Sequence, residues 1–183
     1  MVTGGSLYSR TVPGDLDFDI DGLTARTEGQ TLEPEEVLPL LDADPDFVDS
    51  STLHVGKRGF EVDDAAMFLW QSELMQDSWL LAVRDPEHTL VSVITLLMPH
   101  PDDGQPWIGA LLLRTEGDLD AVGAPVLATL ETKLAGRGWR TLSVSPMIDQ
   151  ERRISWWKSA GYRPLDVRPD NNRREVLRLR KSL

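Results

Sequence analysis

A run of small residues follows an apolar segment near the middle of the chain, and together they could bind a phosphate group. Leu111 to Thr115 predicts the end of a strand, and Asp120 to Pro125 reads Asp-Ala-Val-Gly-Ala-Pro before a helical pattern begins. A strand that turns sharply into a helix leaves backbone N–H groups unpaired at the positive end of the helix dipole. Small side chains let phosphate oxygens approach those groups. The segment predicts either an anion-binding turn or an ordinary connection that binds nothing.

Other kinds of chemistry are excluded by residue type. The chain has no cysteine, which rules out disulfides, thiolate nucleophiles and sulfur-ligated metals. His54, His88 and His100 have no ligand-like spacing, so we expect no metal site. His54 and His100 fall in predicted loops and have no carboxylate at a spacing typical of a catalytic pair. We therefore interpret both as surface residues and not as catalytic bases.

The hydrophobic pattern predicts a mixed α/β (α+β) domain in the order β-α-α-β-β-β-α-β-α-β-β. Residues 78–84, 89–98 and 107–115 form an antiparallel meander, and the last of these strands is apolar at nearly every position, as in the centre of a sheet. A helix over 122–137 follows, and Gly136 and Gly138 end it. Further segments are a possible first strand at 23–27, helices near 33–41, 62–74 and 149–160, and strands at 139–145, 162–167 and 175–179.

Length and composition predict one soluble domain. We interpret residues 1–30 as a partly loose segment containing the first strand, and residues 31–183 as a single domain. No secretory leader pattern and no apolar run long enough to cross a bilayer is visible, which predicts a cytoplasmic protein without a membrane partner.

Charge is distributed unevenly along the chain, whose formal net charge is −11. Most acidic residues precede Gly104, which argues against nucleic acid as a partner because its phosphates would be repelled. The basic second part either attracts a small phosphorylated ligand or is simply a solvated surface.

Four stretches, in order and correctly spaced, resemble the signatures of the GNAT superfamily of N-acetyltransferases, and the resemblance covers roughly Thr31 to Leu183. They are Leu111–Thr115, Asp120–Pro125, Ala135–Trp139 and the Trp156-Trp157-Lys158-Ser159-Ala160-Gly161-Tyr162 segment. The resemblance implies a GNAT-like, mainly antiparallel sheet flanked by helices. It also implies acetyl-CoA as co-substrate, an amine acceptor, and a homodimer as one oligomeric state, since many relatives pair through edge strands.

The resemblance assigns the acetyl-CoA site to the central strand, the turn and the last helix. The family's turn is Arg/Gln-x-x-Gly-x-Gly/Ala and binds the pyrophosphate, and its central strand diverges from a neighbour to admit the pantetheine arm. The matching positions are Leu113, Arg114, Thr115, Asp120, Ala121, Val122, Gly123, Ala124, Pro125, Val126, Gln150 and Trp157.

Several of these positions differ from the family pattern, so the acetyl-CoA-binding and catalytic motifs are degenerate. Asp120 replaces Arg or Gln, and Pro125 replaces the last small residue. Trp157 stands where many members have a tyrosine that protonates the thiolate, and Gly109 stands where some have a glutamate base. The substitute candidates are Glu116 as base and Tyr162 as acid, against ordinary roles as a turn carboxylate and a packed tyrosine.

Three functions are compatible with these patterns. The first is an acyl-CoA-dependent N-acetyltransferase acting on a primary amine of a small molecule or peptide, for which the acidic first half favours a cationic acceptor. The second is a catalytically impaired GNAT-fold module that binds acyl-CoA or a protein partner. The third is an interaction subunit that uses C-terminal arginines to contact an acidic surface, although we favour solvent-side positions on an edge strand, where basic side chains deter aggregation. These residues are Arg168, Arg173, Arg174, Arg178 and Arg180. Trp70 and Trp107 are candidates for the edge of an acceptor pocket.

Overall fold

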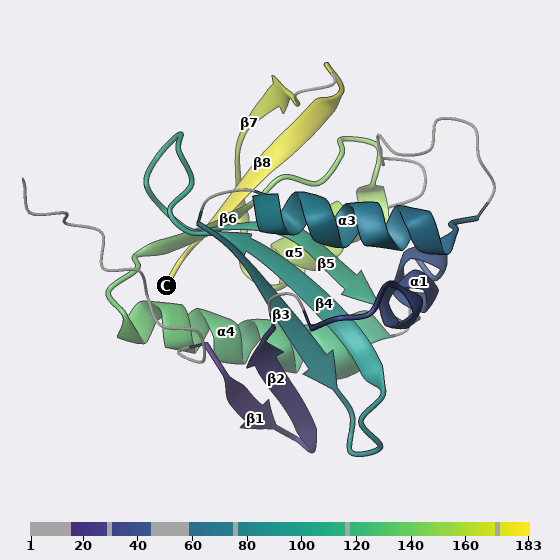
Figure 1. Ribbon diagram of the computed structural model, residues 1–183. Helices are drawn as coiled ribbons and strands as arrows, with labels where there is room; N and C mark the ends of the chain where they lie inside the picture. The colour runs from purple at the N-terminus through teal and green to yellow at the C-terminus, as the bar shows by residue number, and fades with distance from the viewer. Residues whose placement is uncertain (1–15, 29–30, 45–58, 75–76, 116–117, 171–172) are drawn as a thin grey trace, which may run out of the picture.

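The computed structural model of the protein describes residues 16–28, 31–44, 59–74, 77–115, 118–170 and 173–183. Within this part of the chain, one eight-stranded sheet has the order β1-β2-β3-β4-β5-β6-β8-β7 (Figure 1). Neighbouring strands are antiparallel except β5 and β6, which are parallel. The strands are β1 (Phe18–Ile20), β2 (Leu23–Thr27), β3 (Ser78–Arg84), β4 (Leu90–Leu97), β5 (Trp107–Leu113), β6 (Thr141–Val144), β7 (Arg163–Pro169) and β8 (Glu175–Ser182).

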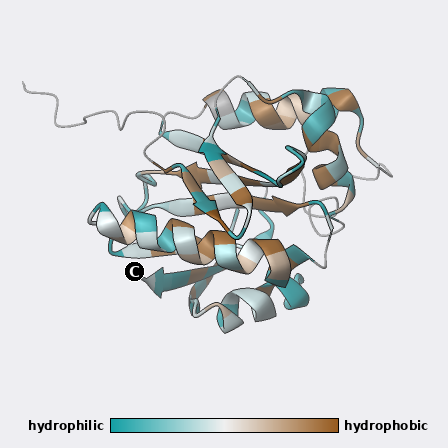
Figure 2. Cartoon of the chain, turned by 90° about the horizontal axis from the view of Figure 1, so that it is seen from below, coloured by the Kyte–Doolittle hydropathy of each residue, from teal (hydrophilic) through white to brown (hydrophobic). Residues whose placement is uncertain are grey.

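Helices cover both faces of the sheet (Figure 1). On one face lie α1 (Pro34–Asp42) and α3 (Val62–Leu74), and on the other lie α4 (Ala124–Gly136) and α5 (Glu151–Ser159). A π-helical turn, η1 (Leu119–Gly123), leads directly into α4. The central strands are brown in Figure 2, whereas α4 carries both teal and brown residues, as expected for an amphipathic helix on a buried sheet.

The central strands separate two hydrophobic clusters. Because successive residues of a strand point to opposite faces, Leu80 packs with the α1 and α3 side chains while Leu81 packs with those of α4. Leu112 and Leu111 of β5 divide between the clusters in the same way. Burial on both faces explains why these strands are apolar at nearly every position.

The fold confirms the mixed, mainly antiparallel sheet predicted from the sequence, including the strand at Leu23–Thr27. Two local features differ from the prediction. The short strand β1 precedes β2 and is joined to it through Asp21 and Gly22, which both have positive φ. The helix expected from Val122 begins earlier, because η1 precedes it.

Candidate functional site: a cavity where two central strands diverge

The parallel strands β5 and β6 pair over only a short length. Trp107 is aligned with Ser143 and Ile108 with Val144, and no further pairs of these strands occur in the described residues. A bulge at Gly109 accompanies the divergence, because Thr95 of β4 pairs with Ala110 and the next residue, Leu96, pairs with Ile108. A bulge bends its strand and increases the local twist. Past Ile108, β5 therefore has β4 on one side and a gap on the other.

Glycine at the bulge has a steric reason. A Cβ atom added to Gly109 would lie 2.8 Å from Oγ1 of Thr95, which is closer than non-bonded atoms approach. The close contact with Thr95 of β4 therefore favours glycine at this position.

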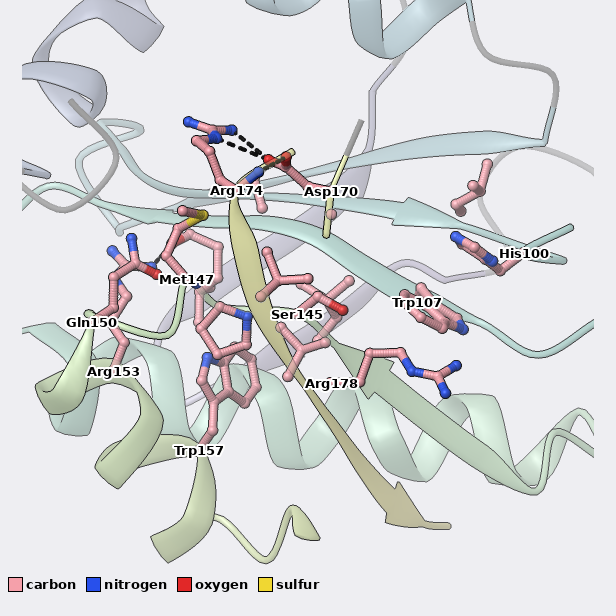
Figure 3. A pocket seen from close by; sticks show the side chains of 18 of the residues that line it. His100, Trp107, Ser145, Met147, Gln150, Arg153, Trp157, Asp170, Arg174 and Arg178 are labelled. Atoms are coloured by element: carbon pink, nitrogen blue, oxygen red, sulfur yellow. Dashed lines mark hydrogen bonds and ion pairs between the residues drawn. The ribbon is translucent and has the colours of Figure 1, made fainter. Parts of the chain in front are cut away.

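A cavity of about 630 Å³ occupies the gap (Figure 3). One wall is β5 from Ile108 to Leu112, and the facing wall is the end of β6 with the segment that follows it, residues 144–147. The helix α5 and the residue before it contribute Gln150, Arg153 and Trp157. The far end is lined by the β4–β5 loop, by two residues of α3 and by the β7–β8 hairpin. Elements distant in sequence thus meet around the strand that the sequence singled out.

Two predicted site residues, Gln150 and Trp157, lie in this cavity wall. Gln150 precedes α5, and its Oε1 accepts a hydrogen bond from the backbone N–H of Met147 at 2.9 Å, which fixes the segment after β6. Trp157 is 3% exposed and packs edge-on against Trp156 and Tyr162. An indole N–H does not ionise near neutral pH, so Trp157 shapes the cavity without offering a proton.

The turn after β5 is stabilised by its own acidic residues. Oδ2 of Asp118 accepts a hydrogen bond from the N–H of Thr115 at 3.0 Å. Oδ1 of Asp120 accepts one from the indole Nε1–H of Trp156 at 3.2 Å, which ties η1 to α5. These contacts give both carboxylates a structural role, but they also place negative charge at the turn where the sequence predicts phosphate binding.

The remaining predicted residues of the turn have different surroundings. Gly123 is buried, and an added Cβ would lie 3.5 Å from both Leu113 and Trp156, so a small residue suits this contact between η1, β5 and α5. Val126 is fully buried in the cluster beneath the sheet. The guanidinium of Arg114 donates to the carbonyl of Leu90 on β4 at 3.3 Å. Ala121 is exposed, and Val122, Ala124 and Pro125 are half-buried.

Leu113 and Thr115 line a second, smaller hollow of about 20 Å³ beside the turn. Its other walls are Ala43, Asp44, Leu119, Arg152 and Arg153. The opening beside β5 that the sequence predicted for Leu113 and Thr115 is therefore divided into a large cavity and a small hollow, and these two residues face the small one.

The two predicted catalytic residues lie elsewhere. Glu116 falls outside the described residues. Tyr162 is fully buried and is not among the residues that line the cavity; its hydroxyl donates to Oε1 of Glu131 at 3.0 Å. Burial, with the Glu131 carboxylate beside it, raises the pKa of the Tyr162 hydroxyl. This environment keeps the tyrosine protonated and makes it a poor proton donor.

His100, expected as a surface residue, is half-buried and lines the cavity. Its ring stacks on Trp107 with ring centroids 4.0 Å apart, and its Nδ1 accepts a hydrogen bond from the N–H of Asp102 at 3.1 Å. Burial lowers the pKa of His100, although Asp102 and Asp103 oppose the shift. The neutral ring therefore presents Nε2–H to its surroundings, which suits a hydrogen-bond donor better than a base. The other predicted histidine, His54, lies outside the described residues.

The far end of the cavity carries a balanced set of charges. Arg168 pairs with Asp102 at 3.0 Å and Arg174 with Asp170 at 2.7 Å. Arg178 lies 5.7 Å from the centre of the Trp107 ring and pairs with Asp166, whose pKa is lowered by the hydrogen bond from Arg178. Sequence reasoning favoured a solvent-facing edge for these arginines and missed them as cavity residues, because no local spacing reports that the β7–β8 hairpin lies beyond β6 and lines the same cavity as β5.

Of the two tryptophans considered for an acceptor pocket, Trp107 lines the cavity and Trp70 does not. Trp70 is 54% exposed on α3. Among the described residues, no three His, Asp or Glu side chains are grouped so that they could hold a metal ion. Within the same part of the chain, no helix is both long enough and apolar enough to span a membrane.

Known proteins resemble this chain in structure but not detectably in sequence. No protein-family model matches the sequence, and no curated protein matches it either. The fold, in contrast, closely matches solved structures of N-acetyltransferases of the GNAT superfamily, each at low sequence identity.

Three of these structures illustrate the likeness. An acetyltransferase from Thermus thermophilus has a TM-score of 0.70 at 13% identity, covering 91% of this chain and 100% of its own. The microcin C7 self-immunity acetyltransferase, in complex with acetyl-CoA and AMP, has a TM-score of 0.66 at 12% identity, covering 90% and 94%. Spermidine N-acetyltransferase from Vibrio cholerae, in complex with CoA and spermine, has a TM-score of 0.60 at 11% identity, covering 89% and 96%.

The chain therefore has the GNAT fold, as the resemblance of its signatures implied.

Proposed function

We propose that the protein is an acyl-CoA-dependent N-acetyltransferase that transfers acetyl from acetyl-CoA to a primary amine of a small molecule or peptide. The observation that carries this proposal is the divergence of β5 from β6 beyond Ile108, which opens the cavity beside the central strand. Two of the structural neighbours named above are complexes with CoA or acetyl-CoA, which supports the same class of donor.

The backbone of β5 fits the arm of such a donor. From Gly109 to Leu113 this strand has β4 as its strand neighbour on one side only, within the described residues. N–H and C=O groups on the other side are suited to bind the amides of a pantetheine arm, as an exposed sheet edge binds an extended peptide. The cavity volume is also within the usual range for a small-molecule site.

The residues in the cavity favour catalysis by positioning. The amine nitrogen would attack the thioester carbonyl carbon, the C–S bond would break, and the proton lost by the amine would neutralise the thiolate directly or through water. Thiolate is a good leaving group, and holding the two reactants in contact contributes several kcal/mol. The indole of Trp157 cannot act as a general acid. The Tyr162 hydroxyl is buried and bonded to Glu131, which makes it a poor proton donor. Glu116 stays a prediction for the base.

The acceptor end of the cavity supports an amine carrying further polar groups. At this end Asp102 and Asp170 lie among the lining residues together with Arg168, Arg174 and Arg178. The acidic first half of the chain raised the expectation of a cationic acceptor, and one structural neighbour is a complex with spermine. The mixed charges in the cavity do not add support to that expectation. His100 and the paired arginines would instead suit a small molecule or peptide end that carries both hydrogen-bond acceptors and an amine.

Titration calorimetry with acetyl-CoA, and with CoA as comparison, tests donor binding. We expect binding in the micromolar range, followed by thiol release when a panel of primary amines is added. No heat at millimolar ligand, with the protein shown to be folded by circular dichroism, would refute the proposal. Donor binding without multiple turnover would instead favour an acyl-CoA-binding module, for which Trp157 at the acid position is the structural argument.

Asp120 provides a sharper test of where the phosphates bind. Replacing it by Asn keeps an oxygen that can accept from Trp156 and removes a negative charge from the turn. A solvent-screened carboxylate beside a pyrophosphate costs about 1 kcal/mol, so we expect Asp120→Asn to tighten acetyl-CoA binding about fivefold. Asp19→Asn, which removes a carboxylate paired with Arg26 beside β2, serves as the control and should leave the affinity unchanged. Equal affinities for both variants and the wild type would place the phosphates away from this turn.

A further inference from the structure

Arg153 of α5 extends across the gap to two other elements. Its Nη1 donates to the carbonyl oxygen of Leu111 on β5 at 3.2 Å. Its Nη2 forms an ion pair with Oδ2 of Asp44, just beyond the C-terminal end of α1. Three elements that are distant in the sequence are thus joined by one side chain at the middle of β5.

This ion pair lies between the two hollows beside β5. Along the strand, the large cavity touches residues 107–112, and the small hollow touches Leu113 and continues to Thr115 in the turn. Among the residues that the structure describes, Asp44 and Arg153 line both hollows. Figure 3 shows Arg153 beside Gln150, at the α5 side of the cavity. The wall common to the two spaces is therefore built from this pair.

The pair is largely removed from water. The Asp44 side chain is 3% exposed and that of Arg153 is 19% exposed. A buried carboxylate needs its partner, because an unpaired charge in this environment is strongly unfavourable. Arg153 also uses a carbonyl group of β5 on the side where an extended donor arm would hydrogen-bond. The wall is nevertheless made of side chains, and a long arginine side chain can change rotamer without moving the backbone.

A donor with phosphates at the turn and its thioester in the large cavity has to pass this position. The phosphates would lie near Thr115 and η1, and the reactive end would lie beside Gly109 and Ala110. The connecting arm would run along Leu111 to Leu113, where Arg153 lies.

We propose that the Arg153–Asp44 ion pair is an intramolecular latch that closes the passage between the turn and the cavity, and that acyl-CoA binding displaces it. This inference rests on the proposed function. It adds that the free protein is held in a closed state, so part of the binding energy of the donor is used to open the latch.

Asp44→Asn tests the latch, because it keeps the size of the side chain and removes the charge that holds Arg153. We expect at least a fivefold lower Kd for acetyl-CoA by titration calorimetry, about 1 kcal/mol of binding free energy. Arg153→Ala should also lower the Kd, whereas a phosphate-binding role for Arg153 would raise it and overturn the proposal. Should either variant fail to fold, Asp44→Asn combined with Arg153→Gln removes both charges and carries the same expectation.

Glu36→Gln is the matched control. Glu36, on α1, likewise pairs with an arginine of another element, Arg84 of β3, but neither residue lines either hollow. Its Kd should equal that of the wild type. Equal affinities for the wild type and all folded latch variants would reject the latch and leave the proposed function intact. Binding by a latch variant alone would support the latch strongly, and no binding by any of these proteins would reject the proposed function itself.

Discussion

Trp157 and Tyr162 belong to one signature but have different surroundings. Trp157 lies in the cavity wall, whereas the Tyr162 hydroxyl points into the core and meets Glu131, whose other carboxylate oxygen pairs with Lys181 at 2.6 Å. Glu131 is 8% exposed, so both contacts are needed to compensate its burial. At this position the tyrosine has a structural role, and the signature alone does not distinguish it from a catalytic one.

Tyr162→Phe should therefore lower stability and leave acetyl transfer unchanged. Removing one donor from a buried carboxylate costs about 1–2 kcal/mol of unfolding free energy, while the phenyl ring keeps its packing against Trp157. Urea denaturation measures the first effect, and kcat with a saturating amine measures the second. A normal stability with a strongly reduced kcat would instead restore Tyr162 as the acid.

At the scale of elements, ion pairs connect helices to the sheet around the site. The Arg84 side chain of β3 donates to both carboxylate oxygens of Glu36 on α1, at 2.7 and 3.2 Å. This contact holds the beginning of α1 against β3, whereas Asp44, beyond the other end of the helix, is held by Arg153 of α5. Separate ion pairs therefore lie at the two ends of this short helix.

The Glu36 contact makes part of the stability dependent on pH. The hydrogen bond from Arg84 lowers the pKa of Glu36 below its ordinary 4.5, so its contribution is present above that pH and is lost as pH falls through the lowered pKa. Both side chains are partly exposed, and we expect Glu36→Gln to cost less than about 1 kcal/mol at neutral pH.

Urea denaturation at neutral and acidic pH measures this effect. The difference between the variant and the wild type should shrink towards zero in acid. Glu35→Gln changes a neighbouring, exposed carboxylate in the same helical turn and accounts for any helix-dipole effect. A difference that persists unchanged in acid would show that the Glu36 charge is not the cause.

At the scale of the whole molecule, one sheet is shared by two hydrophobic clusters. Leu112 is fully buried against the α1 and α3 side, and Leu130 of α4 is fully buried on the opposite side. Since both clusters include residues of β3, β4 and β5, neither can lose its packing without exposing the central strands. The edge strand β7, with Leu165 and Val167 exposed, is compatible with the predicted homodimer, which stays a prediction.

The shared sheet predicts a single cooperative unfolding transition. Leu112→Ala and Leu130→Ala should each destabilise the protein by about 2–5 kcal/mol, the usual range for a buried leucine. Calorimetry should show one peak for both variants, with equal calorimetric and van't Hoff enthalpies. Two separate transitions in either variant would mean that the two clusters unfold independently.

Much of the architecture follows from the sequence alone. Apolar runs in β3, β4 and β5, the helical stripes and the glycine stops specify which segments form strands and helices, because burial and backbone geometry are local requirements. The resemblance of its signatures also implied the GNAT fold, which the structure confirms. The strand β1 was missed because three residues are too few to show a period of two.

The site was only partly predictable, for a physical reason. Gln150 and Trp157 were found through local signatures, but Arg153, Arg178 and His100 enter the cavity because β5 and β6 diverge and the β7–β8 hairpin folds beside them. A side chain's neighbours across a gap depend on strand order and on the bulge at Gly109, and these are properties of the assembled sheet. The sequence by itself therefore determined the elements and their order, while only the tertiary structure decided which charges meet at the gap and that Arg153 and Asp44 divide it.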